Sequence, residues 1–496
     1  MLKRVFVAPD PGRMRLRFAV RAVLGIGLAV VACGLAGHSL PGAVTGGLAA
    51  LLALFTVTDA TVRGQAVTTA LLPAVGLPVL AAAAELHDQP VARDLTFLAV
   101  VGAGVYARRW GPRGHSLGVF AFMTYFVAQF LHATPGQLPE LYAAVLLSVL
   151  AASAVRFGLW CYERLLPPAP VPAPPAGTGL SRVTTRQAIQ ATAGAGFALV
   201  VGQLLSGERW YWAVGATWWV FVNTTSRGET LVRGFRRVLG TVIGIGLGLL
   251  VAVPLHGSAV PTAVLLAACV FGIFYTAAVS YTWMMLCVTV LAELLYGLLG
   301  VLEPALLALR LAETGVGALG AVLAVLFVLP VTTHTVTHAW IQRALRCVHA
   351  CAAEAAARLA GDDTADPTAR VADLEQLLGR VRLSVAPLVH PLNPMLGRKH
   401  RARRVLALLD DCAREIRGLA AITADPEASH DARLAAACWR VEAAVEALTG
   451  GGDVAVSTAG ALATEPALAH LHGVERALGD LAKPLRAPSR SPLVGA

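Results

Sequence analysis

Residues 209–253 read RWYWAVGATWWVFVNTTSRGETLVRGFRRVLGTVIGIGLGLLVAV, and the interpretation of the whole chain starts from this stretch. An aromatic-rich apolar segment is followed by a polar corner, residues 223–229, and then by a second, glycine-rich apolar segment. Arg233, Arg236 and Arg237 lie in the first turns of the second segment. Cations at membrane depth are costly unless they face a cavity, water or an anion. This corner is therefore the first candidate for a functional site.

The composition is that of a membrane protein. Of the 496 residues, 56% are hydrophobic and 14% are charged, which is unusual for a soluble globular chain. The formal net charge is +10, and the basic excess lies in residues 1–333, with 21 Lys and Arg against 12 Asp and Glu. Residues 334–496 carry 19 against 18. Because this polar part is nearly neutral, the expected partner is the lipid bilayer and not nucleic acid.

Apolar segments of membrane-spanning length predict about twelve transmembrane helices in two groups of six. The first group occupies residues 18–165, after a basic segment, residues 1–17, without a signal-peptide cleavage site. A Pro-rich linker covers residues 166–185, and the second group occupies residues 186–332. Arginine is concentrated in the loops that this topology places inside. Both termini are therefore expected in the cytoplasm, and the protein in the cytoplasmic membrane.

The two groups align with a constant offset of 164 residues, which indicates an internal repeat. Arg63 falls on Arg227, Gly76 on Gly240, and Gln129 on Glu293. Because each repeat has an even number of helices, the two repeats are expected to run parallel, related by an axis along the membrane normal.

The sequence changes character after residue 332. Residues 333–483 predict a cytoplasmic domain of Ala-, Arg- and Glu-rich amphipathic helices, and residues 484–496 a disordered tail. In one of these helices Leu374, Leu377, Leu378 and Val381 follow the spacing of a single apolar face. The predicted fold class is all-α: a polytopic membrane protein with two parallel six-helix repeats and a C-terminal cytoplasmic helical domain.

The arginines of the corner are candidates for substrate binding. A guanidinium matches the two oxygens of a carboxylate, and Arg233 and Arg237 share one helical face. The alternative is positive-inside anchoring, with the side chains reaching the lipid headgroups. The candidate substrate-binding residues in and around the corner are Asn223, Arg227, Arg233, Arg236, Arg237 and Thr241.

Carboxylates within apolar segments are candidates for proton coupling. Glu293 lies well inside its segment, and Glu313 lies near the start of the segment predicted at 311–331, where it is expected beside Arg310 at the interface. Glu293 is also open to a purely structural pairing with Arg156 or Arg21, which lie within the first group of helices.

The aromatic and glycine residues each allow two interpretations. Trp218 and Trp219 are deep enough to stack on an aromatic substrate, or to pack against neighbouring helices or lipid. Residues 210–212 are expected in an interfacial aromatic belt. The series Gly240, Gly244 and Gly248 favours close helix packing over a substrate lining.

Enzymatic motifs are missing from the sequence. It contains no phosphate-binding loop, no zinc-protease motif and no nucleophile elbow. The eight cysteines form no Cys-x-x-Cys pair and are expected to be reduced and structural. We therefore expect no cofactor, no metal and no enzyme activity.

The corner motif resembles a known family. The pattern Arg-x-x-x-Arg-x-x-Gly-Thr-x-x-Gly, present at residues 233–244, is similar to that of the fusaric acid resistance protein-like, or aromatic acid exporter, family. The resemblance implies proton-driven efflux of aromatic or other organic acids. The first repeat departs from the pattern, because Thr69 and Pro73 take the positions of Arg233 and Arg237. We therefore expect one basic site and not two symmetric ones.

The leading hypothesis is a secondary exporter of small organic anions, linked to the proton-motive force. A passive organic-anion channel gated by the cytoplasmic domain and a membrane scaffold that transports nothing are the alternatives. A homo-oligomer is compatible with all three.

Overall fold

The structure is a computed structural model that describes residues 13–158, 178–222, 224, 227–255, 258–298, 300, 302–329, 333–359, 362, 364–389, 396–423, 432–450 and 466–486. Within these ranges every regular element is a helix. The predicted basic terminus up to residue 12, the linker residues 159–177, Asn223 and the tail from residue 487 lie outside them. The chain divides into two compact units, one from the described parts of Met1–Thr224 and Thr230–Pro330 and one from those of Thr225–Glu229 and Val331–Ala496.

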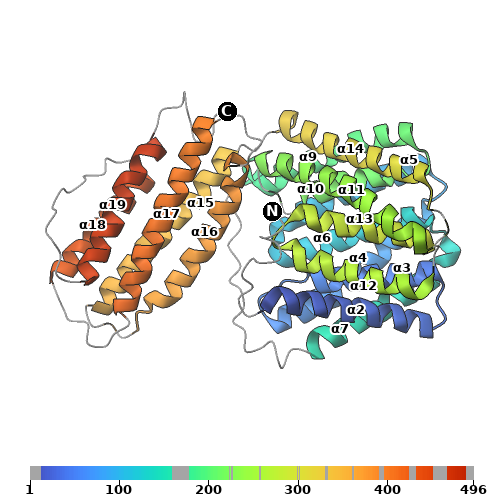
Figure 1. The fold of residues 1–496 in the computed structure, drawn as a ribbon, viewed down its shortest axis with the longest axis horizontal. Helices are drawn as coiled ribbons and strands as arrows, with labels where there is room; N and C mark the ends of the chain where they lie inside the picture. The colour runs from blue at the N-terminus through green and yellow to red at the C-terminus, as the bar shows by residue number, and fades with distance from the viewer. Residues whose placement is uncertain are drawn as a thin grey trace. The chain divides into compact units, whose positions relative to one another are not determined.

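The first unit begins with six helices joined by short turns (Figure 1). They are α2 (Met14–Leu35), α3 (Leu40–Thr56), α4 (Val62–Glu85), α5 (Pro90–Ala107), α6 (Gly111–Leu131) and α7 (Leu138–Gly158). Polar caps mark where helices begin: the side chains of Ser39 and Thr61 accept hydrogen bonds from backbone N–H groups in the first turns of α3 and α4.

Six more helices complete the first unit. They are α9 (Val183–Leu205), α10 (Tyr211–Phe221), α11 (Arg227–Leu255), α12 (Ala259–Ala277), α13 (Tyr281–Leu298) and α14 (Pro304–Phe327). Among the described residues, nine helical stretches are long and apolar enough to cross a membrane, and one of them, Pro90–Leu131, contains both α5 and α6. The chain is thus a polytopic helical membrane protein. The assignment of all twelve helices of this unit as spans stays a prediction.

The same pairs of helices pack together in the two groups of six. In the first group α2 packs on α3 and α7, α3 on α7, α4 on α6, and α5 on α6. In the second group α9 packs on α10 and α14, α10 on α14, and α12 on α13, while glycines of α11 contact α13. Between the groups, α5 packs on α9 and α12 packs on α2. Here α9 is the counterpart of α2, and α12 is the counterpart of α5. The contact of α12 with α2 is therefore the equivalent of the contact of α5 with α9, with the two groups interchanged.

Two helices differ from the segments predicted for them. Within the segment at 209–226 the described helix is the short α10, Tyr211–Phe221, which ends where the backbone of Val222 becomes extended. The Thr224 hydroxyl donates back to the carbonyls of Val220 and Phe221. The segment predicted at 311–331 begins earlier, at Pro304, which occupies the first turn of α14. Arg310 therefore lies inside a helix and not before one.

Arg156 holds the end of α3 in place. Its guanidinium donates to the carbonyls of Ala53, Leu54 and Val57 at 2.7, 2.9 and 3.1 Å, and to the side-chain oxygen of Gln65 at 3.3 Å. The last carbonyls of a helix have no partner within the helix, and in a membrane such groups must be satisfied by other protein atoms. The role of this buried arginine is therefore structural.

Replacing Arg156 with Leu should lower the free energy of unfolding by about 3 kcal/mol or more, because hydrogen bonds from a charged donor are lost and several carbonyls remain buried without partners. Titration of the purified protein with a denaturing detergent measures the loss. Arg186→Gln is the matched control, since this half-buried arginine donates to the carbonyl of the nearby Leu180 and ends no helix. Equal stability of the two variants would contradict the assignment.

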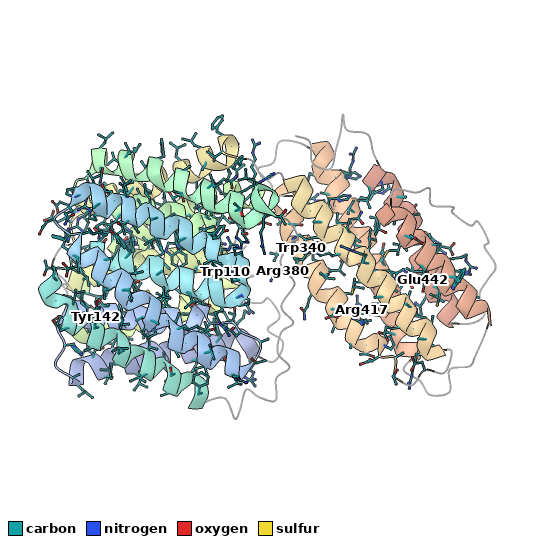
Figure 2. The ribbon with its side chains drawn as sticks, turned by 180° about the vertical axis from the view of Figure 1, so that it is seen from behind. Trp110, Tyr142, Trp340, Arg380, Arg417 and Glu442 are labelled. Atoms are coloured by element: carbon teal, nitrogen blue, oxygen red, sulfur yellow. The ribbon has the colours of Figure 1, made fainter. Side chains whose placement is uncertain are left out.

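The second unit consists of five helices with a core of their own. They are α15 (Thr333–Leu359), α16 (Pro367–Val389), α17 (Leu396–Thr423), α18 (Ala432–Gly450) and α19 (Pro466–Arg486). Leu374, Leu378 and Val381 are at most 2% exposed, which confirms the apolar face predicted for α16. On the surface, Arg417 of α17 pairs with Glu375 of α16 at 3.1 Å (Figure 2). An exposed pair of this kind adds little stability.

Candidate functional site

Arg233 and Arg237 converge on one tyrosine. The ring of Tyr281, the first residue of α13, lies under the Arg233 guanidinium at 4.1 Å, and its hydroxyl accepts from Arg237 Nη1 at 3.4 Å. Arg233 Nε and the Tyr281 hydroxyl both donate to the carbonyl of Trp219, at 3.1 and 3.3 Å. The end of α10 and the starts of α11 and α13 therefore form one polar cluster, which we call the basic cluster.

Arg237 is the buried member of the basic cluster. It is 8% exposed, its Nη1 also approaches the sulfur of Met285 at 3.1 Å, and its Nε has no hydrogen-bond partner among the described residues. No described carboxylate lies within 4.0 Å of it. A buried charge is stabilised only when an opposite charge or hydrogen bonds compensate it. The Arg237 guanidinium is therefore able to bind an anion. A side chain that anchors the protein to lipid headgroups must be exposed, whereas Arg237 is buried within the protein.

The remaining candidates around the corner take no part in these contacts. Arg236 is half-buried on the neighbouring face of α11, and Thr241 is buried one turn after Arg237. Arg227 is half-buried at the first position of α11, in the segment that groups with the second unit. Asn223 is outside the described residues. The structure thus brings together Arg233 and Arg237, and it adds Tyr281, which lacks a spacing signal in the sequence.

The glycines of α11 form its contact with α13. A methyl group on Gly240 would lie 2.7 Å from the Thr282 carbonyl, and one on Gly244 would lie 2.6 Å from Thr289. A methyl group on Gly248 would overlap the carboxyl group of Glu293. Gly246 points into open space. The series spaced by four therefore serves close helix packing, the favoured interpretation of the sequence, and at Gly248 it makes room for an ionisable group.

Glu293, Arg310 and Glu313 form a second cluster, which we call the buried ionic cluster. Both glutamates are fully buried and Arg310 is 5% exposed. Arg310 acts electrostatically on both carboxyl groups, yet no nitrogen of its guanidinium lies within 4.0 Å of a carboxyl oxygen of Glu293 or Glu313. All four carboxyl oxygens lack hydrogen-bond partners among the described residues. Buried ionisable groups inside apolar helices are costly and are often functional, so this cluster is the second candidate site.

The structure excludes the alternative pairing of Glu293 and corrects the predicted position of Glu313. Glu293 does not pair with Arg156, because that guanidinium is taken up by the end of α3. It does not pair with Arg21 either, whose guanidinium lies over the ring of Phe18; the nearest cationic influence is Arg310. Glu313 is not interfacial, because α14 begins at Pro304 and carries Glu313 into its third turn. The i, i+3 spacing of Arg310 and Glu313 was the available sequence signal for their shared face.

The tryptophans divide between packing and the clusters. Trp218 is 1% exposed and stacks on Phe122 with ring centroids 4.3 Å apart, so it is a packing residue. Trp219 contributes its carbonyl to the basic cluster. Trp210 and Tyr211 are each 2% exposed, which corrects their prediction as interfacial belt residues: α10 is surrounded by α9, α14 and α6.

Replacing Trp218 with Ala should lower the free energy of unfolding by about 3–5 kcal/mol, because a large buried side chain leaves a cavity. Trp219→Ala should cost less, because this side chain is only half-buried and its carbonyl remains. Detergent titration of both variants measures the difference. Loss of carboxylate binding by Trp218→Ala at unchanged stability would instead identify Trp218 as a substrate contact.

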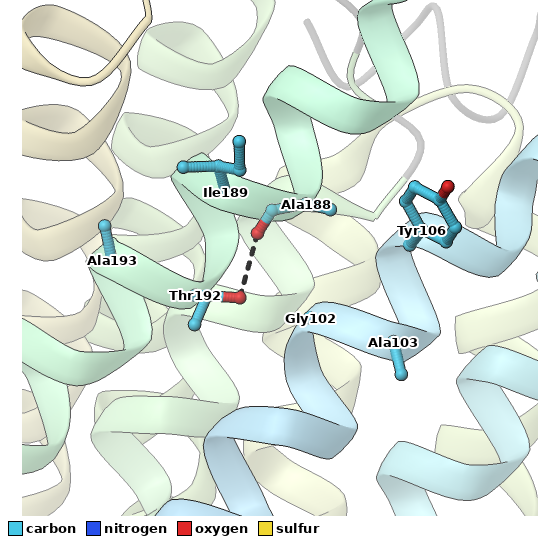
Figure 3. A pocket seen from close by; sticks show the side chains of 7 residues that line it. All are labelled: Gly102, Ala103, Tyr106, Ala188, Ile189, Thr192 and Ala193. Carbon is cyan, nitrogen blue, oxygen red and sulfur yellow. Dashed lines mark hydrogen bonds between the residues drawn. The ribbon is translucent and has the colours of Figure 1, made fainter. Parts of the chain in front are cut away.

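A hollow of about 540 Å³ lies between α5 and α9 (Figure 3). It is lined by Gly102, Ala103, Tyr106, Ala188, Ile189, Thr192 and Ala193. The Thr192 hydroxyl donates to the Ala188 carbonyl at 2.9 Å, and the Tyr106 hydroxyl accepts from Arg109, which is not part of the lining. None of these side chains carries a charge. The hollow therefore offers an anion no counter-charge and does not coincide with either cluster.

The described part of the chain shows no set of converging metal ligands, and two of its buried cysteines, Cys412 and Cys438, are poor nucleophiles. Burial raises the pKa of the Cys412 thiol to about 12 and that of Cys438 to about 11, so neither is a thiolate at neutral pH. No three His, Cys, Asp or Glu side chains among the described residues converge as metal ligands.

Residues 197–324 match the sequence model of a family described as Fusaric acid resistance protein-like. The match begins in α9 and ends in α14, so it contains the basic cluster and the buried ionic cluster. No curated protein matches the chain.

Proposed function

We propose that this chain, which belongs through residues 197–324 to the Fusaric acid resistance protein-like family, exports aromatic or other organic acids across the cytoplasmic membrane at the expense of the proton gradient. The family match and the apolar helices favour a transporter over an enzyme. The proposal places both termini in the cytoplasm and treats the two groups of six helices as parallel repeats, which the recurring helix pairs support.

The observation that carries the proposal is Arg237. It is a buried guanidinium without a carboxylate within 4.0 Å, and it lies beside a second guanidinium that is fixed on a tyrosine ring. Keeping such a charge buried is unfavourable unless an anion compensates it. The guanidinium edge fits a carboxylate. The proposed site therefore uses Arg237 as the main contact and Arg233 as its neighbour.

The buried carboxyl groups favour proton coupling over a passive channel. A channel needs no buried group that takes up and releases protons, whereas an exporter driven by the proton gradient does. We assign this role to Glu293, because its carboxyl group is fully buried without a hydrogen-bond partner among the described residues and lies on α13, twelve residues after Tyr281 of the basic cluster. Movements of protons at Glu293 and of anions at Arg237 would thus be linked through one helix.

Replacing Arg237 with Gln should reduce the apparent affinity for a carboxylate about 10- to 100-fold, because a charge-assisted hydrogen bond contributes about 1.5–3 kcal/mol. Uptake of labelled benzoate into inverted membrane vesicles measures the change, after correction for the amount of protein in the membrane. Arg236→Gln removes the same charge one residue away. Equal kinetics for both variants and the unmodified protein would overturn the site.

Replacing Glu293 with Gln should remove the response of transport to an imposed pH gradient while downhill flux of benzoate continues, because glutamine cannot carry a proton. Glu303→Gln is the matched control, since Glu303 is exposed just before α14 and its side chain makes no cap hydrogen bond. A Glu293→Gln protein that still responds to the gradient would favour the passive channel.

A further inference from the structure

The buried ionic cluster lies at the end of the helices opposite to the basic cluster. Arg237 contacts Tyr281 at the start of α13, and Glu293 follows twelve residues later, about 18 Å along the helix axis. The short α10 spans the same interval, since its Trp219 carbonyl belongs to the basic cluster and its Trp212 ring lies against Arg310. Arg310, the second buried arginine without a carboxylate within 4.0 Å, is thus remote from Arg237.

Arg310 is held by aromatic faces. Its guanidinium carbon lies 4.3 Å from the ring centroid of Trp212 and 5.8 Å from that of Tyr296. An aromatic face attracts a cation without using its N–H groups. The arginine is thereby fixed in position while the hydrogen-bonding edge of the guanidinium stays available.

Three hydrogen-bond donors around Arg310 have no acceptor. Arg310 Nη1, the indole Nε1 of Trp212 and the hydroxyl of Tyr296 are all buried and unpartnered among the described residues. Buried donors without acceptors are rare in folded proteins, and three of them around one guanidinium match the oxygens of an anion. Two phenol oxygens come near these donors without completing a hydrogen bond: that of Tyr296 lies towards Arg310, and that of Tyr211 lies towards the Trp212 indole.

The charges of the cluster do not balance. Two carboxyl groups share the Arg310 guanidinium, and among the described residues Glu313 is also influenced by Arg209, in the turn before α10. With both carboxyl groups ionised, the three residues carry a net negative charge in a buried place, which is unfavourable. One bound proton restores neutrality. The number of protons in the cluster therefore determines how strongly Arg310 is neutralised by its own neighbours.

We propose that Arg310 is a second carboxylate-binding site, with Trp212 and Tyr296 as neutral co-donors, and that Glu293 and Glu313 are resident counter-charges which an incoming carboxylate replaces when they are protonated. The inference rests on the proposed function and deepens it. An anion leaving Arg237 would meet a second cation at the far end of the same helices, where its binding is tied to proton uptake.

The pH dependence follows from the groups that face Arg310. Glu293 and Tyr296 on α13 and Glu313 on α14 interact with Arg310 directly, whereas Tyr211 on α10 and Arg209 before α10 act on Glu313 and Tyr296. Of these, the two glutamates compete with a bound carboxylate for Arg310 while they are ionised. Lowering the pH protonates them and relieves the competition, so carboxylate binding at Arg310 strengthens as the pH falls.

The test counts benzoate bound to the purified full-length protein by equilibrium dialysis at pH 6 and pH 8. We expect one site per chain at pH 8 and a second site at pH 6. The variant Glu293→Gln/Glu313→Gln should show both sites at both pH values, because glutamine does not compete for Arg310. The variant Arg310→Gln/Glu293→Gln/Glu313→Gln removes all three charges together, leaves no uncompensated ion, and should keep a single site at both pH values.

The outcomes separate this inference from the proposed function. A second benzoate site that persists in the triple variant, or a pH dependence unchanged in the double variant, would overturn the role of Arg310 while leaving Arg237 untouched. If Arg237→Gln keeps both sites, the proposed function loses its site and the assignment of Arg310 stands. Failure of the unmodified protein to bind benzoate at either pH would overturn both.

A pair of glycine variants tests the cluster without removing a charge. The added methyl group of Gly248→Ala overlaps the Glu293 carboxyl group and must displace it, whereas that of Gly246→Ala meets nothing within 4 Å on the opposite face of the same helix. Gly248→Ala should therefore shift the pH at which the second benzoate site appears, and Gly246→Ala should not. Identical pH profiles for the two variants would contradict the position of Glu293 in this site.

Discussion

A charge inside the membrane-spanning unit must be compensated by other protein atoms or by something that binds there, and the structure depends on this constraint. Arg156 meets it within the protein, because its guanidinium donates to the carbonyls that end α3. Arg237, Arg310 and the two buried glutamates do not, since each retains buried polar atoms without partners. The same chemical group is thus structural in the first half of the unit and a candidate for transport in the second.

This difference between the halves was visible in the sequence only in part. The offset of 164 residues places Thr69 and Pro73 where the second half has Arg233 and Arg237, so a single basic site could be predicted. Hydropathy located the helices because spanning segments must be long and apolar. The packing face of α11 followed from glycines spaced by four, since only small residues allow backbones to approach so closely.

Partners across helices could not be predicted. Nothing in the sequence indicates that Glu293 lies near Arg310 and not Arg156, because apolar periodicity fixes which residues share a face but not which face meets which helix. Hydropathy predicts the start of α14 too late and puts Arg310 at the interface, whereas Pro304 begins the helix two turns earlier. Tyr281 was missed because its role arises only where α13 begins beside α10 and α11. The aromatic residues 210–212 resemble an interfacial belt in composition, yet the short α10 buries the first two of them.

The central claim is that the first unit moves organic anions and links their movement to protons. Flux of labelled aromatic and aliphatic carboxylates in proteoliposomes, with and without an imposed pH gradient, tests it most directly. The account predicts carboxylate flux above that of protein-free liposomes, and a faster rate when the gradient is imposed. Flux equal to that of protein-free liposomes for every carboxylate, in the presence of the gradient, would contradict it.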